Sequence, residues 1–224
     1  MIIDLRQPTL VVAGQWNPRI FGMDWVAQNL FQLEAGATIE VGQVFAPDRP
    51  LPILFINGVG VGCSGERLEL YATDYVDEGL AAVEAVALRA LELLGHTPVF
   101  GFGANFTFFD PEVDARFADG MLTAERLEAH FRVTDRNYKT TISLEDGVML
   151  TLARHIGRDG VQIAMNFHHA VDGAEAARVR LPGALVLARP QALKIMADFY
   201  GQEEFSTAKF GAAQSGGEDA EAGN

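Results

Sequence analysis

The chain has 224 residues, an apolar fraction of 49% and a formal net charge of −13. These values are typical of a globular protein that can bury a sizeable core, and they exclude a wholly disordered chain. The negative charge repels phosphate backbones and the seventeen Lys and Arg residues are scattered along the chain. We therefore expect no nucleic-acid partner.

The cysteine content and the apolar stretches indicate where the protein resides. Cys63 is the single cysteine, so an intramolecular disulfide is excluded. The N-terminus lacks the basic leader and apolar run of a secretory signal. The longest apolar-rich stretch, from Val76 to Leu94, is interrupted by five charged residues, which excludes a membrane span. These features predict a cytoplasmic protein without a membrane partner.

The N-terminal half, about residues 1 to 110, alternates strand and helix patterns. Period-two and apolar runs predict strands, and helical spacing of apolar residues predicts helices. The expected strands cover residues 9–13, 38–45, 51–59, 67–72 and 99–109, and the expected helices cover 23–33 and 75–94. This order matches the βαββαβ arrangement of ferredoxin-like domains. It is our prediction for this half.

The C-terminal half, about residues 111 to 205, reads as a β-meander with a final helix. After a helical patch near 111–130, Asp-Gly turns separate alternating runs, as in consecutive hairpins. The expected strands cover 138–144, 148–156, 161–167 and 184–188, and the final helix covers 190–200. No internal repeat of fixed period is found.

The domain prediction follows from these patterns. Residues 1–205 are expected to form a single α+β domain with a mainly antiparallel sheet. Beyond Phe205 the composition shifts to Gly, Ala, Ser and Glu, which cannot bury enough apolar surface to order itself. We therefore predict that 206–224 is a disordered acidic tail.

A glycine-rich segment contains the spacing of a dinucleotide-binding loop. Gly60, Gly62 and Gly65 form a literal G-x-G-x-x-G after a predicted strand. In a dinucleotide site a helix follows, and its N-terminus binds the pyrophosphate. Here a period-two pattern follows instead, which predicts another strand. The segment therefore favours a hairpin or bulge, and we expect no cofactor.

The segment from Asn166 to Arg178 carries the most chemically suggestive pattern. Its His168, Asp172 and Gly173 form His-x-x-x-Asp-Gly, which resembles the signature of CoA-dependent acyltransferases such as chloramphenicol acetyltransferase and the dihydrolipoyl acyltransferases. The resemblance implies that His168 is a general base that deprotonates a thiol or hydroxyl acceptor, and that Asp172 is structural. Imidazole suits such proton transfer at neutral pH. The alternative is a strand that runs into an Asp-Gly turn.

Two further groups of residues are candidate sites. His168 and His169 are adjacent on a predicted strand, where neighbouring side chains point to opposite faces, so we expect no metal site. Trp16, Arg19 and Trp25 bring aromatic rings and a guanidinium together near a turn. Trp and Arg are favoured at binding hot spots, which makes this a candidate binding patch. The alternative is a loop held against the core.

We interpret the chain as a non-catalytic interaction or assembly protein, because no catalytic pattern keeps the context it needs. A protein partner, or self-association through exposed strand edges, is expected. The alternatives are an acyltransferase that uses His168 and a small-ligand-binding domain. The three hypotheses require different surfaces: an apolar patch with a polar rim, an accessible pocket that contains His168, and an enclosed cavity, respectively.

Overall fold

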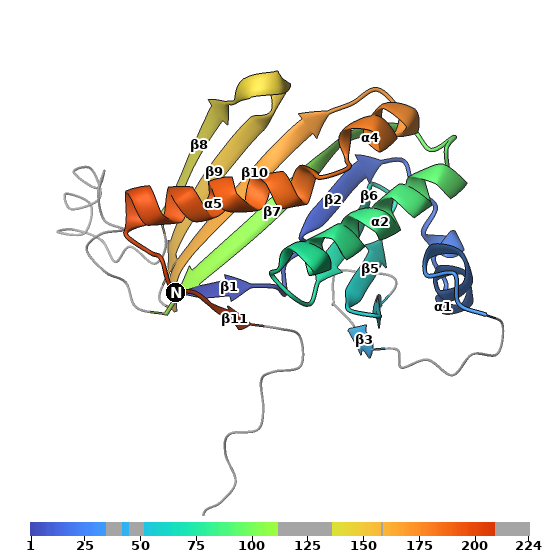
Figure 1. Ribbon diagram of the computed structural model, residues 1–224, viewed down its shortest axis with the longest axis horizontal. Helices are drawn as coiled ribbons and strands as arrows, with labels where there is room; N and C mark the ends of the chain where they lie inside the picture. Colours follow the sequence, from blue (N-terminus) through green and yellow to red (C-terminus); the bar gives the residue numbers. More distant parts are fainter. Residues whose placement is uncertain (35–41, 45–51, 112–135, 158, 209–224) are drawn as a thin grey trace, which may run out of the picture.

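The computed structural model describes residues 1–34, 42–44, 52–111, 136–157 and 159–208. It has an α+β fold, with one large and mainly antiparallel sheet and four α-helices in the described residues (Figure 1). The predicted α+β class and antiparallel sheet are confirmed at this level.

The sheet is continuous from β3 to β8. Its order is β3-β4-β5-β6-β2-β7-β10-β9-β8, and neighbouring strands along this path are antiparallel. The strands are β1 (Ile2–Asp4), β2 (Leu10–Gly14), β3 (Gly42–Val44), β4 (Ile53–Ile56), β5 (Val59–Cys63), β6 (Arg67–Ala72), β7 (Val99–Asp110), β8 (Arg136–Ser143), β9 (Met149–Gly157), β10 (Gly160–Ala170) and β11 (Ser206–Ala208). Beside this path, β1 pairs with the end of β7 and with β11.

Helices pack on one face of this sheet, which we call the helix face (Figure 1). Among them, α2 (Asp77–Leu93) contacts β5, β6 and β2, whereas α4 (Ala174–Arg180) and α5 (Ala184–Tyr200) contact β7. Alternate residues of the central strand β7 point into this layer, and Phe102, Phe106 and Phe108 are almost fully buried there. We call the other side of the sheet the opposite face.

The two halves repeat one topology. In each half the first strand lies beside the last strand of a meander, β2 beside β6 and β7 beside β10, and a helix follows that last strand. The two first strands, β2 and β7, pair antiparallel in the middle of the sheet. An antiparallel pair has approximate two-fold symmetry about an axis through the sheet. The two central strands are therefore related by such an axis, and the meanders of the two halves extend from them in opposite directions along the sheet.

This topology differs from the one predicted for the N-terminal half. A ferredoxin-like domain places two strands between its helices, whereas four strands, β3 to β6, lie between α1 (Met23–Trp25) and α2. The ferredoxin-like arrangement is not confirmed. The helix expected over 23–33 ends earlier than predicted. After α1 a π-helical turn, Val26–Leu30, follows, and Phe31 is its C-cap.

The prediction of a strand over 184–188 is wrong. The helix α4, which was not predicted, follows the bend at Asp172 and Gly173 after β10, and residues 184–188 form the first turns of α5, which includes Pro190. The reason is a distant contact: both carboxylate oxygens of Glu84 on α2 accept hydrogen bonds at the start of α5, from Gly183 N at 2.7 Å and Leu185 N at 2.6 Å. These bonds satisfy backbone groups that a helix start leaves without partners.

The backbone conformation also shows what the glycine-rich segment and the start of the predicted tail form. The glycine-rich segment forms β5 of a hairpin, and the turn before it has positive φ at Asn57 and Gly58, as a two-residue hairpin turn requires. Three residues that we assigned to the tail, Ser206–Ala208, form β11 parallel to β1. The rest of the predicted tail and most of the helical patch over 111–130 lie outside the described residues. No helix in the described ranges is long and apolar enough to cross a membrane.

Candidate functional site

The two adjacent histidines of β10 point to opposite faces, as the strand geometry predicts. His168 lies on the opposite face above Gly101 of β7, where an added Cβ would be 2.7 Å from its Cε1 atom. His169 lies on the helix face, where its ring stacks on Phe102 with centroids 4.5 Å apart. A close neighbour therefore fixes the place of each ring.

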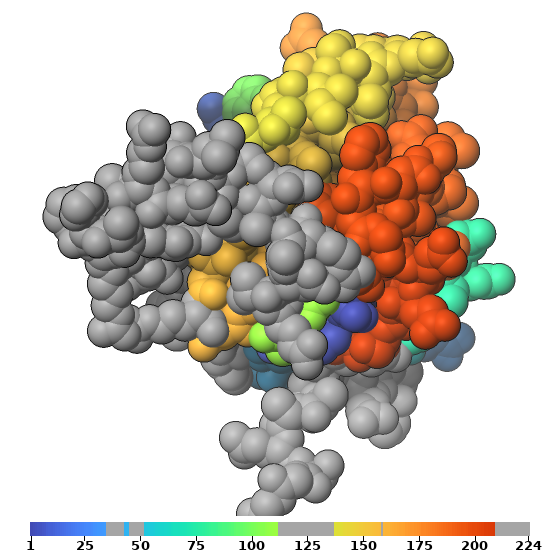
Figure 2. Space-filling view, turned by 90° about the vertical axis from the view of Figure 1, so that its left-hand side faces the viewer, coloured from blue at the N-terminus to red at the C-terminus, as the bar shows by residue number. Residues whose placement is uncertain are grey.

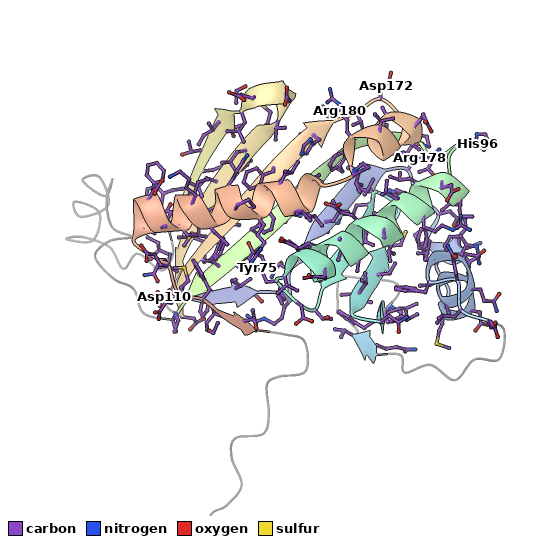
Figure 3. The ribbon with its side chains drawn as sticks, viewed as in Figure 1. Tyr75, His96, Asp110, Asp172, Arg178 and Arg180 are labelled. Atoms are coloured by element: carbon purple, nitrogen blue, oxygen red, sulfur yellow. The ribbon has the colours of Figure 1, made fainter. Side chains whose placement is uncertain are left out.

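Asp172 lies in a different part of the structure from the His168 ring. It lies in the loop between β10 and α4 and its side chain is exposed, pointing away from the body of the protein (Figure 3). No hydrogen bond or ion pair between these two residues occurs in the described parts of the chain. His168 also lines neither of the two pockets described below. The acyltransferase hypothesis stays a prediction.

The aromatic residues near the N-terminus are arranged around a buried ring. Trp16 is buried and its Nε1 donates a hydrogen bond to the carbonyl oxygen of Val12 at 3.0 Å. Phe21 packs edge-on against Trp16 and against the partly buried Trp25. Arg19 is exposed in the intervening 3-10 turn, Pro18–Ile20. The contacts attach this loop to the core, so the predicted patch offers mainly Arg19 and part of Trp25.

Cys63 has the surroundings of a packed residue. It is buried at the end of β5, and burial raises the pKa of its thiol to about 12. The thiolate is the reactive form of cysteine, so this thiol is held in its unreactive form at neutral pH. Within the described residues there is also no group of three or more His, Cys, Asp or Glu side chains that could hold a metal ion.

A groove on the helix face was not anticipated from the sequence. It lies between the β8–β9 hairpin and the α4–α5 junction and has a volume of about 880 Å³. In Figure 2 this hairpin (yellow) and α5 (red) occupy neighbouring parts of one face. Its apolar lining includes Leu144, Val148, Phe167, Pro182, Leu187 and Ala188, and its polar lining consists of Ser143, Glu145, Asp146, His169, Arg180 and Gln191. We call this hollow the hairpin groove.

Charge is unevenly distributed around the hairpin groove. Arg180, the last residue of α4 (Figure 3), lines one side of the groove, and it donates a hydrogen bond to the carbonyl oxygen of Ala170. Glu145 and Asp146 lie at the other side, in the short 3-10 turn that joins β8 to β9. Leu187 is 69% exposed although it is a large apolar residue. The groove thus combines accessible apolar surface with opposite charges at its two sides.

His169 gives the hairpin groove a pH-dependent group. Burial, the positive charge of Arg180 and the neighbouring His168 all lower its pKa below the ordinary value of 6.5. A lowered pKa means that the unfolded chain binds a proton more readily than the folded protein, so stability falls as the pH drops below about 6.5. At neutral pH this ring is uncharged and can donate or accept a hydrogen bond.

We expect this histidine to contribute to acid sensitivity. The free energy of unfolding of the wild-type protein should fall between pH 7.5 and 5.5, and the fall should be smaller in His169→Gln, which has no titrating ring. Urea titrations of both proteins at the two pH values measure the difference. An equal fall in both proteins would show that His169 does not titrate differently on folding.

Comparisons with known proteins add no family to this description. A scan of the chain against protein-family models finds no match, and a search of curated proteins finds no similar sequence. We therefore infer the function from the hairpin groove and its residues. The walls of the groove come from segments about forty residues apart, so no local pattern predicted it. The sequence predicted the Glu-Asp-Gly turn of one wall, but not the groove that this wall helps to form.

Proposed function

We propose that the protein is a non-catalytic, cytoplasmic interaction protein that binds a segment of a partner protein in the hairpin groove. The observation that carries the proposal is the accessible apolar surface around Leu187 with a polar and charged rim. Exposed apolar patches with polar rims are typical of protein interaction sites. An apolar side chain of the partner would fill the centre of the groove and displace water from it.

The charges at the rim favour a particular kind of segment. Arg180 attracts a carboxylate, whereas Glu145 and Asp146 attract a basic side chain. A segment with an apolar anchor between residues of opposite charge would therefore bind in one direction, since a reversed segment would bring like charges together. Such complementarity provides specificity more than affinity.

A partner of different sequence is favoured over a second copy of this chain. Self-association through sheet edges was the other form of assembly expected from the sequence. In the described sheet β8 is an end strand and carries Lys139, and charged residues on edge strands oppose pairing with another strand. We therefore assign the partner role to the groove and not to the edge.

The test is site-specific photo-crosslinking in the native host. Leu187 is replaced by a photo-reactive phenylalanine analogue in one protein and Phe199 in the other. Both positions are exposed on α5, at 69% and 75%, but Phe199 lies outside the groove lining. We expect one discrete crosslinked protein from position 187 and none from position 199.

A pair of charge substitutions completes this test. Leu187→Glu should abolish co-purification of the crosslinked protein, because the partner would have to bury a carboxylate, whereas Phe199→Glu should leave it unchanged. Equal crosslinking from both positions, or capture that survives Leu187→Glu, would contradict the proposal.

A further inference from the structure

A second pocket lies on the opposite face of the sheet, away from the hairpin groove. It has a volume of about 370 Å³, within the range of small-molecule sites. Strands β7, β9 and β10 form its floor, and the segment that enters β2 and one residue of β6 form its side. The polar residues that line it are Gln7, Arg67, Asn105, Thr107, Thr151 and Asn166. We call it the amide pocket.

Small residues make this hollow. Ala153 of β9 and Ala164 of β10 are paired across the two strands and both line the pocket. Gly103 of β7 lies next to Asn166, and a Cβ atom at that position would overlap the Asn166 side-chain amide. Larger side chains would fill the space above these strands. The chain therefore leaves room above the sheet and at the same time fixes the position of one polar side chain.

Two asparagine side chains form a fixed hydrogen-bonding pair in the amide pocket. Asn105 and Asn166 face each other across β7 and β10, and Asn166 Nδ2 donates to Asn105 Oδ1 at 2.5 Å. This bond leaves an N–H donor on Asn105 and a carbonyl acceptor on Asn166. If both amides were turned over, the bond would reverse and one donor and one acceptor would still remain. The pair thus offers a donor beside an acceptor in either orientation.

Arg67 supplies a positive charge at the side of the pocket. Its Nε lies 2.7 Å from Oε1 of Glu69, whose other carboxylate oxygen accepts a hydrogen bond from the Tyr71 hydroxyl at 2.9 Å. Glu69 is buried and Tyr71 is buried beside it, whereas the Arg67 side chain is 53% exposed. A buried, hydrogen-bonded carboxylate therefore holds the guanidinium through one edge, and its remaining N–H groups can bind another anion.

We propose that the amide pocket binds a small carboxylate that also carries an amide group. Arg67 binds the carboxylate, and the Asn105–Asn166 pair binds the N–H and C=O of the amide. A protein of net charge −13 attracts few anions non-specifically, so such a ligand needs a local cation and matched hydrogen bonds. This site is independent of the hairpin groove and of the function proposed for it.

The probe for this inference is N-acetylglycine, which has one carboxylate and one amide. Titration of the full-length protein is followed by the ¹⁵N–¹H NMR signals of the asparagine side-chain amides and of the strand backbones. We expect saturable shifts at Asn105, Asn166 and their neighbours on β7 and β10. N-acetylglycinamide, which lacks the carboxylate, should bind at least about tenfold more weakly, since a charge-assisted hydrogen bond contributes this much.

A near-isosteric variant separates binding from folding. Asn105→Asp keeps the acceptor for Asn166 Nδ2 but loses the free donor and places a negative charge in the pocket. It should fold and yet lose binding of N-acetylglycine at least about tenfold. Arg180→Ala, in the hairpin groove, is the matched control and should bind like the wild-type protein.

Three results would overturn the inference. They are the absence of saturable shifts at Asn105 and Asn166, equal affinity for N-acetylglycine and N-acetylglycinamide, and unchanged binding by a folded Asn105→Asp variant. The folded state of each variant is checked from the dispersion of its backbone signals. Failure of these titrations would leave the photo-crosslinking result at Leu187 unaffected, because the two sites lie on different faces of the sheet.

Discussion

Replacing Glu84 with alanine is expected to lower the free energy of unfolding by about 3 kcal/mol, because it removes two charge-assisted hydrogen bonds to backbone amides. Glu84 is buried on α2, and its carboxylate accepts from Gly183 N and Leu185 N at the start of α5. The alanine variant leaves these amides without their partner. Urea unfolding of the variant and the wild-type protein measures the difference.

Two further variants make this prediction specific. Glu84→Gln retains one carbonyl acceptor and places an amide N–H group against the second backbone N–H, so its loss should lie between those of the alanine variant and the wild type. Glu92→Ala removes an exposed carboxylate of the same helix that pairs with Arg89, and it should cost less than about 1 kcal/mol. A loss in Glu84→Ala no larger than that in Glu92→Ala would show that the helix start does not depend on this contact.

The same contact connects stability to the proposed function. The residues that follow Gly183 form the part of α5 that carries Leu187 and lines the hairpin groove. Loss of the Glu84 contact should therefore also reduce crosslinking from position 187 under conditions in which the protein remains folded. Glu84 acts on the groove through the position of α5.

Replacing Phe106 with alanine is expected to lower the free energy of unfolding by about 3–5 kcal/mol, the usual cost of removing a buried phenylalanine ring. Phe106 lies on the central strand β7 and is 1% exposed. Its ring packs edge-on against Tyr75, from the N-terminal half, and against Phe167, from the C-terminal half. For a chain of this size the melting temperature should fall by about 10 °C. Thermal unfolding followed by circular dichroism measures the change.

The shape of that transition tests the predicted domain organisation. If residues 1–205 form a single domain, Phe106→Ala should shift one cooperative transition and leave its form unchanged. Phe100→Ala is the control, because Phe100 lies on the same strand but is 58% exposed, and it should cost less than about 1 kcal/mol. Two separate transitions, of which only one shifts, would contradict the single-domain prediction.

Local patterns were sufficient where neighbouring residues decide the conformation. The alternation from Tyr138 to Phe167 predicted strands that the structure contains as β8, β9 and β10, because period-two burial fixes which face each residue occupies. The helical spacing of apolar residues after Tyr75 predicted α2 in the same way. The opposite orientation of His168 and His169 also follows from strand geometry alone.

Contacts between distant residues decided the rest. The apolar run from Ala184 to Ala188 is compatible with a strand or a buried helix, and Glu84, about one hundred residues earlier, selects the helix by accepting hydrogen bonds from its first turn. The repeated topology of the two halves was also hidden, since it consists of strand order and not of similar residues at a fixed spacing.

The candidate sites likewise combine features that local patterns predict with features that depend on contacts between distant residues. Composition and the period of the strands are enough to predict the acidic charge, the packed Cys63, the meander and the placement of its two histidines on opposite faces. The long-range folding of the chain is needed to bring His169, Arg180 and Leu187 into one groove, and Arg67, Asn105 and Asn166 into another pocket. Sheet pairing brings such residues together from remote segments, and no local pattern in the chain encodes that proximity.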